Sequence, residues 1–204
     1  MEASREEGRA LFGLSEDDTM LLVFGGSLGA RHINEAVVAL KDELLSRPRL
    51  HVVPITGPTE LDAVTEALAL TEEEAGRWTL LGYQDRMGET MAAADAIVSR
   101  AGATSLAEIS ARAIPALLVP YPHATEDHQT TNARAYVDAG CAFMVPDAEL
   151  DTPAFSEAVF SLIDDEAVRA AQTAAARAQK TAEAATMLAD VVTAAAEGRP
   201  STVQ

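Results

Sequence analysis

Two turns built from small residues in this chain each stand between an apolar run and a helical pattern. The first, Gly25-Gly26-Ser27-Leu28-Gly29, follows the apolar run at residues 20–24. Its glycines let a ligand approach the backbone closely, and the start of the following helix offers free N–H groups and about half a positive charge. Gly26 and Ser27 are therefore candidate contacts for an anion such as a phosphate. The alternative is a plain turn, because the motif lacks both a full dinucleotide fingerprint and the lysine of a P-loop.

The second turn, at residues 100–105, follows the apolar run at 96–99 and again opens a helix. The small Ala103 leaves the helix start open, and the hydroxyls of Thr104 and Ser105 can cap that start or donate to phosphate oxygens. Glu108 lies three residues after Ser105, on the same helical face, where its carboxylate could accept both hydroxyls of a ribose. The alternative is a capping box of Ser105 and Glu108 that only starts the helix.

A third polar segment, at residues 120–132, follows the apolar run at 116–120. Gln129 and Asn132 are three residues apart at the start of a predicted helix, so both amides point to one side. Each amide can donate and accept hydrogen bonds, which suits the hydroxyls of a sugar, and the neighbouring His128 could contribute. The alternative is Asp127 as the N-cap of a solvated helix face.

Short apolar runs alternate with helical patterns along the chain, and these elements must position the three polar segments. The runs do not alternate with polar residues, which is typical of strands buried on both faces of a parallel sheet. Strands are predicted at residues 20–24, 51–55, 79–81, 96–99, 116–120 and 142–145. Helices are predicted at residues 30–46, 59–70, 86–93, 105–113 and 128–139. The order predicts an α/β fold with a single Rossmann-like, doubly wound, mostly parallel sheet of six strands.

The chain divides into three predicted parts. Residues 1–165 form the Rossmann-like domain, and residues 166–197 form a long Ala-rich carboxyl-terminal helix. That helix lies either on the edge of its own sheet or against a neighbour outside the domain. Residues 198–204 are expected to be a disordered tail.

Composition excludes several classes of partner. The formal net charge of −17 argues against nucleic acid and against an anionic membrane surface, and it requires a bound diphosphate to be held mainly by backbone amides. The single cysteine, Cys141, cannot form an intrachain disulfide, which favours a reducing, cytoplasmic compartment. No apolar run approaches the ~20 residues that span a bilayer, so no direct membrane insertion is expected. No Asp-x-Asp motif and no set of metal-binding Cys and His residues occurs, so no metal and no cofactor are expected.

Taken together and in order, these segments resemble the carboxyl-terminal domain of the MurG family, glycosyltransferase family 28. The matching stretches are GGSLGARHIN at 25–34, YQDRM at 83–87, SRAGATSLAEI at 99–109 and PYPHATEDHQTTNARAYVDAGCA at 120–142. The similarity extends over roughly residues 9–165. One departure is Ala113-Ile114-Pro115, where family members usually carry a glycine two residues before the proline; it affects the end of a helix rather than the site.

The resemblance implies the donor half of a GT-B enzyme, with UDP-N-acetylglucosamine as donor and an inverting transfer that converts lipid I to lipid II. It implies that Ser27 lies by the diphosphate, that the backbone of Gln84 reads the uracil, and that Glu108 binds the ribose. It further implies that Ala103, Thr104 and Ser105 form the phosphate end of the second helix, and that His128, Gln129 and Asn132 hold the sugar.

The family's acceptor site, membrane-docking patch and general base lie on an amino-terminal domain, so no catalytic residue is expected on this chain. The acceptor is then reached through that domain or through a partner subunit, and the intact enzyme works at the inner face of the cell membrane. Two alternatives stay open: the catalytic subunit of a split lipid-linked N-acetylglucosaminyltransferase, and a non-catalytic module that binds UDP-sugars.

Overall fold

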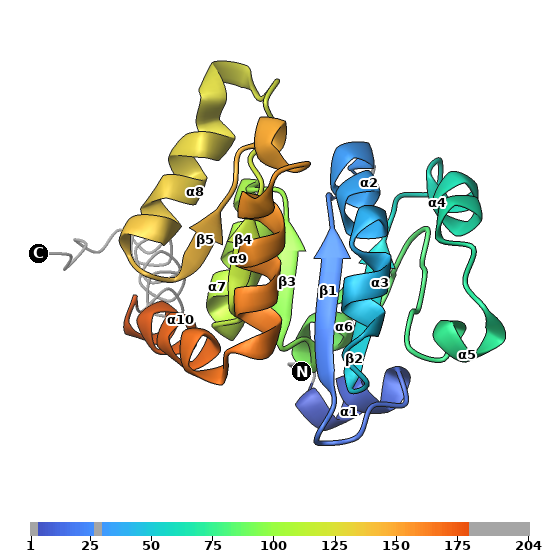
Figure 1. The fold of residues 1–204 in the computed structure, drawn as a ribbon. Coiled ribbons are helices and arrows are strands. Elements are labelled where there is room, and N and C mark those ends of the chain that lie inside the picture. Colours follow the sequence, from blue (N-terminus) through green and yellow to red (C-terminus); the bar gives the residue numbers. More distant parts are fainter. Residues whose placement is uncertain (1–3, 27–29, 180–204) are drawn as a thin grey trace, which may run out of the picture.

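Strands and helices alternate along the chain in the computed structural model, which describes residues 4–26 and 30–179 (Figure 1). The strands are β1 (Thr19–Phe24), β2 (Leu50–Ile55), β3 (Ala96–Ser99), β4 (Ala116–Leu118) and β5 (Ala142–Met144). The α-helices are α1 (Arg5–Leu11), α2 (Arg31–Ala39), α3 (Lys41–Leu45), α4 (Leu61–Leu68), α5 (Glu72–Ala75), α6 (Met87–Ala93), α7 (Ala103–Arg112), α8 (His128–Asp138), α9 (Pro153–Asp164) and α10 (Glu166–Ala178). Two 3₁₀ turns are η1 (Thr125–Asp127) and η2 (Asp147–Glu149).

The five strands form one parallel sheet in the order β2-β1-β3-β4-β5, which confirms the doubly wound α/β fold. The strands end level with one another: Phe24 pairs with Ile55 and Ser99, Ser99 pairs with Leu118, and Leu118 pairs with Met144. All the loops that follow the strands therefore begin at one edge of the sheet. Ligands of open α/β sheets bind at this edge.

The predicted number of six strands is wrong, because residues 79–81 make only isolated bridges to β2. The backbone of Thr79 donates to Val52 and that of Leu81 donates to Pro54. Between these two bonds, Pro54 has no N–H to donate, so the ladder is interrupted at its middle. The segment thus lies along β2 without becoming a regular strand.

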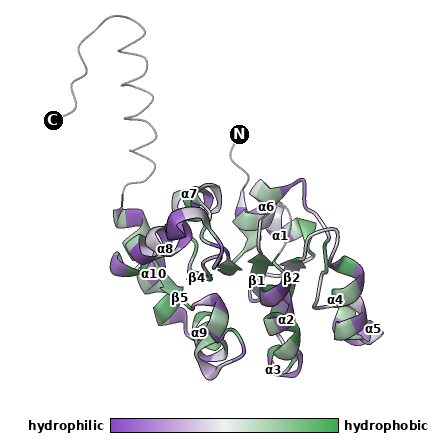
Figure 2. Ribbon diagram, turned by 90° about the horizontal axis from the view of Figure 1, so that it is seen from above, coloured by the Kyte–Doolittle hydropathy of each residue, from purple (hydrophilic) through white to green (hydrophobic). Residues whose placement is uncertain are grey.

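Both faces of the sheet are buried by helices. Met20, Leu22 and Phe24 of β1 enter one core cluster with residues of α6 and α7, whereas Leu21 and Val23 enter the other with residues of α2 and α9. Figure 2 shows these two helical layers on either side of the apolar strands. Continuous burial of both faces explains why the strands carry unbroken apolar runs.

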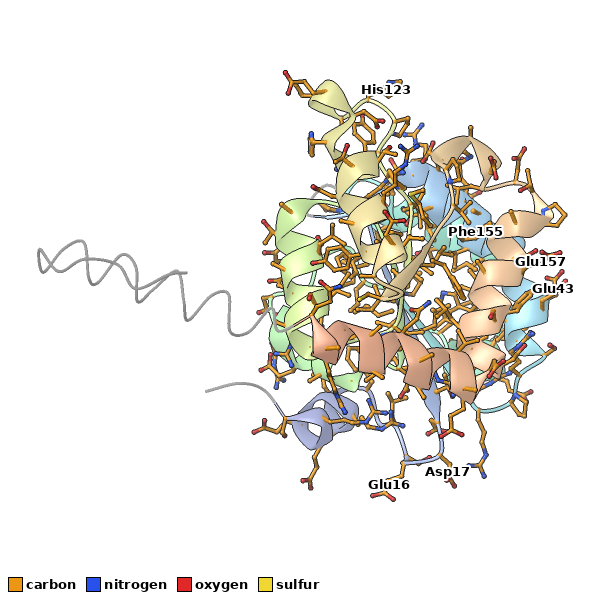
Figure 3. The ribbon with its side chains drawn as sticks, turned by 90° about the vertical axis from the view of Figure 1, so that its left-hand side faces the viewer. Glu16, Asp17, Glu43, His123, Phe155 and Glu157 are labelled. Atoms are coloured by element: carbon orange, nitrogen blue, oxygen red, sulfur yellow. The ribbon has the colours of Figure 1, made fainter. Side chains whose placement is uncertain are left out.

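Helix α9 shows how amphipathic patterning fixes a helix on the sheet. Phe155 is 1% exposed and belongs to the core cluster, and Figure 3 shows it pointing from α9 towards the sheet. Glu157 on the same helix and Glu43 on α3 are exposed on the outer surface. Apolar residues on one stripe and charges on the other are what a helix covering a sheet requires.

The described part of the carboxyl-terminal helix, α10, packs on this domain. Ala176 contacts the buried Ala113 and Cys141, and the buried side chain of Gln172 accepts a hydrogen bond of 2.9 Å from the backbone N–H of Ala116. This supports the interpretation that the helix lies on its own sheet edge, for residues 166–178. The predicted remainder of the helix, residues 180–197, and the predicted tail, residues 198–204, lie outside the described residues.

Helix α4 ends at an alanine, Ala69, in a backbone conformation that alanine rarely adopts. Ala69, the exposed C-cap of α4, has a φ of 43° in the left-handed region. Glycine adopts this conformation without strain, so we expect Ala69→Gly to raise the free energy of unfolding by about 0.5–1 kcal/mol. Ala67→Gly, two residues earlier at an exposed position within the helix, should instead lower it by about 1 kcal/mol. Urea titration of both variants measures the two changes, and equal signs would contradict the assignment of this helix end.

Candidate functional site

A cavity of about 610 Å³ opens at the carboxyl edge of the sheet. The loops after four strands, together with the first turns of α2, α8 and η2, line it: Gly25, Gly26, Ala30, Arg31, His32, Arg100, Tyr121, Pro122, His123, Gln129 and Asp147. These residues follow β1, β3, β4 and β5, so four segments far apart in the sequence meet at one place. Gly26 has a φ of 101° and a Cβ there would meet open space, so its glycine is required by conformation.

Of the residues predicted from the sequence, Gly26 and Gln129 line this cavity. Ser27 lies outside the described residues. The other predicted residues are not part of the cavity lining: Gln84, Ala103, Thr104, Ser105, Glu108, His128 and Asn132. Their assignment to a ligand therefore stays a prediction.

The start of α7 is open, and the capping-box alternative for Ser105 and Glu108 is wrong. Helix α7 begins two residues earlier than predicted, with Gly102 as its N-cap and, among the described residues, no side chain capping it. Ala103 and Thr104 are exposed at this end, and Glu108 is exposed one turn further along. An uncapped helix start presents N–H groups to solvent or to a ligand.

Helix α8 holds the α7 turn through two amides. The Gln129 Oε1 atom accepts hydrogen bonds from the backbone N–H groups of Ala101, at 3.1 Å, and Tyr121, at 3.0 Å. The Asn132 Nδ2 atom donates to the carbonyl of Ala101 at 3.3 Å. These bonds brace two loops, a role that the sequence did not predict. They leave the Gln129 amide nitrogen and the Asn132 amide oxygen for a ligand.

The first turn of α8 differs from the capping alternative in detail. Asp127 occupies the N-cap position, but its carboxylate accepts from the Thr130 hydroxyl at 2.6 Å and caps no backbone N–H. The His128 Nδ1 atom lies 2.7 Å from the carbonyl oxygen of Thr125, so Nδ1 carries the proton and Nε2 is left for other partners.

The Gln84 side chain makes a hydrogen bond within its own loop. The Gln84 Oε1 atom accepts from the backbone N–H of Arg86 at 3.0 Å, while the neighbouring Tyr83 is 67% exposed. The Gln84 side chain is thus engaged locally, which is compatible with recognition through the backbone.

Three residues without a sequence-based role form an ion-pair cluster in the cavity wall. Asp147 in η2 lies 2.8 Å from the His32 Nδ1 atom and 2.5 Å from an Arg100 guanidinium nitrogen. Arg100 is buried and also donates to the carbonyls of Val119 and Pro120. Burial alone would raise the pKa of Asp147, but the bonds from His32 and Arg100 hold it below its ordinary value.

The sequence did contain a signal for this cluster. Arg100 and Asp147 come directly after, or soon after, buried strands, and polar residues at that position face the ligand edge of an α/β sheet. The third member, His32, has a side chain that is 42% exposed and lines the cavity. The pairing with Asp147, which is 115 residues away, has no counterpart in local sequence.

A second cavity, of about 670 Å³, lies at the opposite edge of the sheet between α6, α7 and α10. Arg5 and Arg169 in its wall are already engaged, with Asp95 and with backbone carbonyls at the end of α9. Since ligands of this fold gather at the carboxyl edge, we place the functional site in the first cavity.

In residues 4–26 and 30–179, no group of three or more His, Cys, Asp and Glu side chains is arranged to hold a metal ion. The same part of the chain has no helix that is long and apolar enough to cross a bilayer.

The two loops braced by Gln129 should depend on its acceptor atom. We expect Gln129→Met to lower the free energy of unfolding by about 2 kcal/mol, because the backbone N–H groups of the buried Ala101 and the exposed Tyr121 lose their shared partner. Gln129→Glu should retain most of the stability, since a carboxylate oxygen accepts the same two bonds. Chemical denaturation of the two variants measures the difference; equal stability in both would contradict the bracing role.

The family relationship agrees with this architecture. Residues 20–188 match the model of the glycosyltransferase family 28 C-terminal domain. A solved structure of MurG from Acinetobacter baumannii is similar over 86% of this chain and 49% of that chain, with a TM-score of 0.68 and 27% identity. The chain belongs to glycosyltransferase family 28, as a C-terminal domain of that family.

Individual relatives narrow the family further. A protein of Leuconostoc mesenteroides, 44% identical over 165 residues, is named UDP-N-acetylglucosamine--N-acetylmuramyl-(pentapeptide) pyrophosphoryl-undecaprenol N-acetylglucosamine transferase. The match covers 81% of this chain and 45% of that protein. A protein of Acidothermus cellulolyticus with the same name is 40% identical over 97% of this chain and 53% of its own length. The chain thus spans about half the length of these relatives.

Proposed function

We propose that this chain is the donor-binding half of an inverting N-acetylglucosaminyltransferase that takes UDP-N-acetylglucosamine and converts lipid I to lipid II. The observation that carries the proposal is the pair of helices, α2 and α7, that begin at the same sheet edge without side-chain caps among the described residues. The relatives' printed names supply the donor and the acceptor class.

The two helix starts account for binding of a diphosphate by an acidic chain. Their free N–H groups and dipoles favour an anion, and Gly26 leaves room for it to approach the backbone. As the sugar leaves, negative charge develops on the UDP oxygen, and preorganised amides stabilise that charge. Thr104 and Ser105, with Ala103, form the α7 part of this anion site, and Ser27 belongs to the α2 part.

The remaining predicted residues divide between the nucleoside and the sugar. The backbone of Gln84 reads the uracil, and the exposed Glu108 carboxylate accepts the ribose hydroxyls. The sugar hydroxyls are held by the Gln129 amide nitrogen and the Asn132 amide oxygen, with His128 beside them. These two atoms are the ones that the hydrogen bonds to the loops leave unused.

The acceptor, the general base and the membrane contact belong to the other half of the intact enzyme or to a partner subunit. The chain alone then binds donor but transfers nothing, and the assembled enzyme works as a peripheral protein at the cytoplasmic face of the membrane. The other half of the intact enzyme then completes an interdomain cleft, across which the donor is oriented towards an acceptor hydroxyl.

The same donor site would also serve the catalytic subunit of a split enzyme or a module that only binds UDP-sugars. A transfer assay with radiolabelled donor, lipid I and the amino-terminal half of the Leuconostoc relative separates a transferase half from a module that only binds UDP-sugars. Transfer only in the presence of the added half supports the proposal. Transfer by the chain alone contradicts it, and donor binding without transfer under any addition favours the binding module.

A crystal structure of the chain with UDP-N-acetylglucosamine tests the placement directly. We expect the diphosphate between the starts of α2 and α7, the uracil at Gln84 and the ribose at Glu108. Electron density for the nucleotide in the cavity between α6, α7 and α10 would overturn the placement.

A further inference from the structure

The charged groups of the carboxyl-edge cavity are mostly neutralised in pairs. The Arg31 guanidinium binds both oxygens of Glu60, with two bonds of 3.0 Å. The Arg100 guanidinium lies 2.5 Å from an oxygen of Asp147. Neither arginine therefore offers a full unpaired charge to a diphosphate, although both line the cavity.

His32 is placed where an additional positive charge would meet an anion. It is the second residue of α2, whose uncapped start faces the same cavity as Gly25 and Gly26. Its Nδ1 atom lies 2.8 Å from the carboxylate of Asp147. Because a carboxylate only accepts, Nδ1 carries the proton, and Nε2 is the ring atom that a ligand can reach.

Asp147 is well suited to orient this imidazole. Arg100, 10% exposed at its side chain, binds the other oxygen of Asp147 and fixes it on the cavity wall. The carboxylate is ionised at neutral pH, since the His32 and Arg100 contacts keep its pKa low despite burial. A histidine held by a carboxylate has a fixed ring orientation, so Asp147 directs the His32 Nε2 atom away from itself.

We propose that His32 binds the diphosphate of the nucleotide-sugar as an imidazolium, with Nε2–H donating to a phosphate oxygen and Asp147 acting as its positioning residue. This inference rests on the proposed function and adds a protonation step to it. The proton comes from solvent when the donor binds, and no covalent bond forms to the imidazole. The same charge stabilises the UDP as it leaves.

The side chains that face His32 are two arginines, one carboxylate and one further histidine. Asp147 faces it from η2, Arg100 from the turn after β3, and Arg31 from its own helix. His123, in the loop after β4, is the other imidazole in the lining. It is exposed and packs edge-on to Tyr121, with ring centroids 5.6 Å apart, and Figure 3 shows it at the rim of the molecule. Because His123 shares the cavity, the matched control is His51 at the start of β2, whose Nε2 atom lies 3.8 Å from Asp18 and which is not part of the cavity lining.

Calorimetric titration with UDP-N-acetylglucosamine from about pH 5.5 to pH 8.5 tests the proposal. Each phosphate of this donor has one ester and one anhydride bond, so its charge is fixed in that range. For the unaltered chain we expect the Kd to rise about tenfold over this interval as His32 loses its proton. His32→Gln should bind about tenfold more weakly at the acidic end and vary less than about twofold with pH. His51→Gln, which alters an imidazole outside the cavity lining, should behave as the unaltered chain does.

Two further measurements separate the outcomes. Uridine, which has no phosphate, should bind both chains equally at every pH. His32→Lys, which keeps a positive charge, should retain tight binding at the alkaline end. Full pH dependence in His32→Gln overturns the inference and leaves the proposed function intact. No binding of the donor by the unaltered chain at any pH overturns the proposed function itself.

Discussion

Arg100→Met is expected to lower the free energy of unfolding by about 3 kcal/mol, because it leaves the Asp147 carboxylate in a largely buried place without its main counter-charge. The side chains of Arg100 and Asp147 are only 10% and 15% exposed. The substitution also removes the donors for the carbonyls of Val119 and Pro120. Urea denaturation at neutral pH, followed by circular dichroism, measures the loss.

An exposed ion pair provides the control for this variant. Arg49 and Asp17 lie 2.7 Å apart with side chains 63% and 74% exposed. Arg49→Met should therefore cost less than about 1 kcal/mol. The double variant Arg100→Met, Asp147→Asn should recover part of the stability, since it removes the unpaired charge. Equal losses in the Arg100 and Arg49 variants would show that the buried cluster has no special role.

Glu108→Ala is expected to weaken binding of UDP-N-acetylglucosamine about 10- to 100-fold, the effect of removing a carboxylate that accepts from both ribose hydroxyls. Glu108 is exposed on α7, so its removal should leave the unfolding midpoint unchanged. Glu108→Gln should show a smaller loss, because the amide keeps one acceptor. Isothermal titration calorimetry measures all three affinities.

The control for Glu108 is Glu66→Ala, an equally exposed glutamate on α4 away from the cavity. This variant removes the same charge from the chain and should bind the donor normally. The 2′-deoxyribose form of the donor extends the test. The unaltered chain should bind it more weakly than it binds the donor, whereas the Glu108→Ala chain should bind both forms with equal affinity. Binding by Glu108→Ala within twofold of the unaltered chain would remove Glu108 from the site.

The architecture could be predicted from the sequence because it depends on local patterns. Unbroken apolar runs such as residues 20–24 identify strands buried on both faces, and their order with the helices fixes the parallel connections. The prediction of a sixth strand at residues 79–81 was wrong because of a residue on the adjacent strand. Pro54 of β2 has no N–H, so one hydrogen bond of the ladder cannot form. Such an effect becomes visible only when the register is known.

The site divides in the same way. Gly26 and the open start of α7 could be predicted, because glycine and other small residues directly after a predicted strand indicate them. Backbone geometry near a strand end is a local property of the sequence. The contacts of Gln129 with Ala101 and of Asp147 with His32 join elements distant in the chain, so spacing alone could not assign them. The sequence therefore indicated the carboxyl edge of the sheet as the place for a ligand but did not indicate the ion-pair cluster in the cavity wall.

Titration of the chain with UDP-N-acetylglucosamine, compared with UDP-glucose and ADP-glucose, tests the central claim most directly. A self-sufficient donor site predicts saturable binding with a preference for uridine over adenosine and for the N-acetylated sugar over glucose. Equal binding of the uridine and adenosine nucleotides, or no binding at millimolar donor, would contradict the claim that this chain holds the donor.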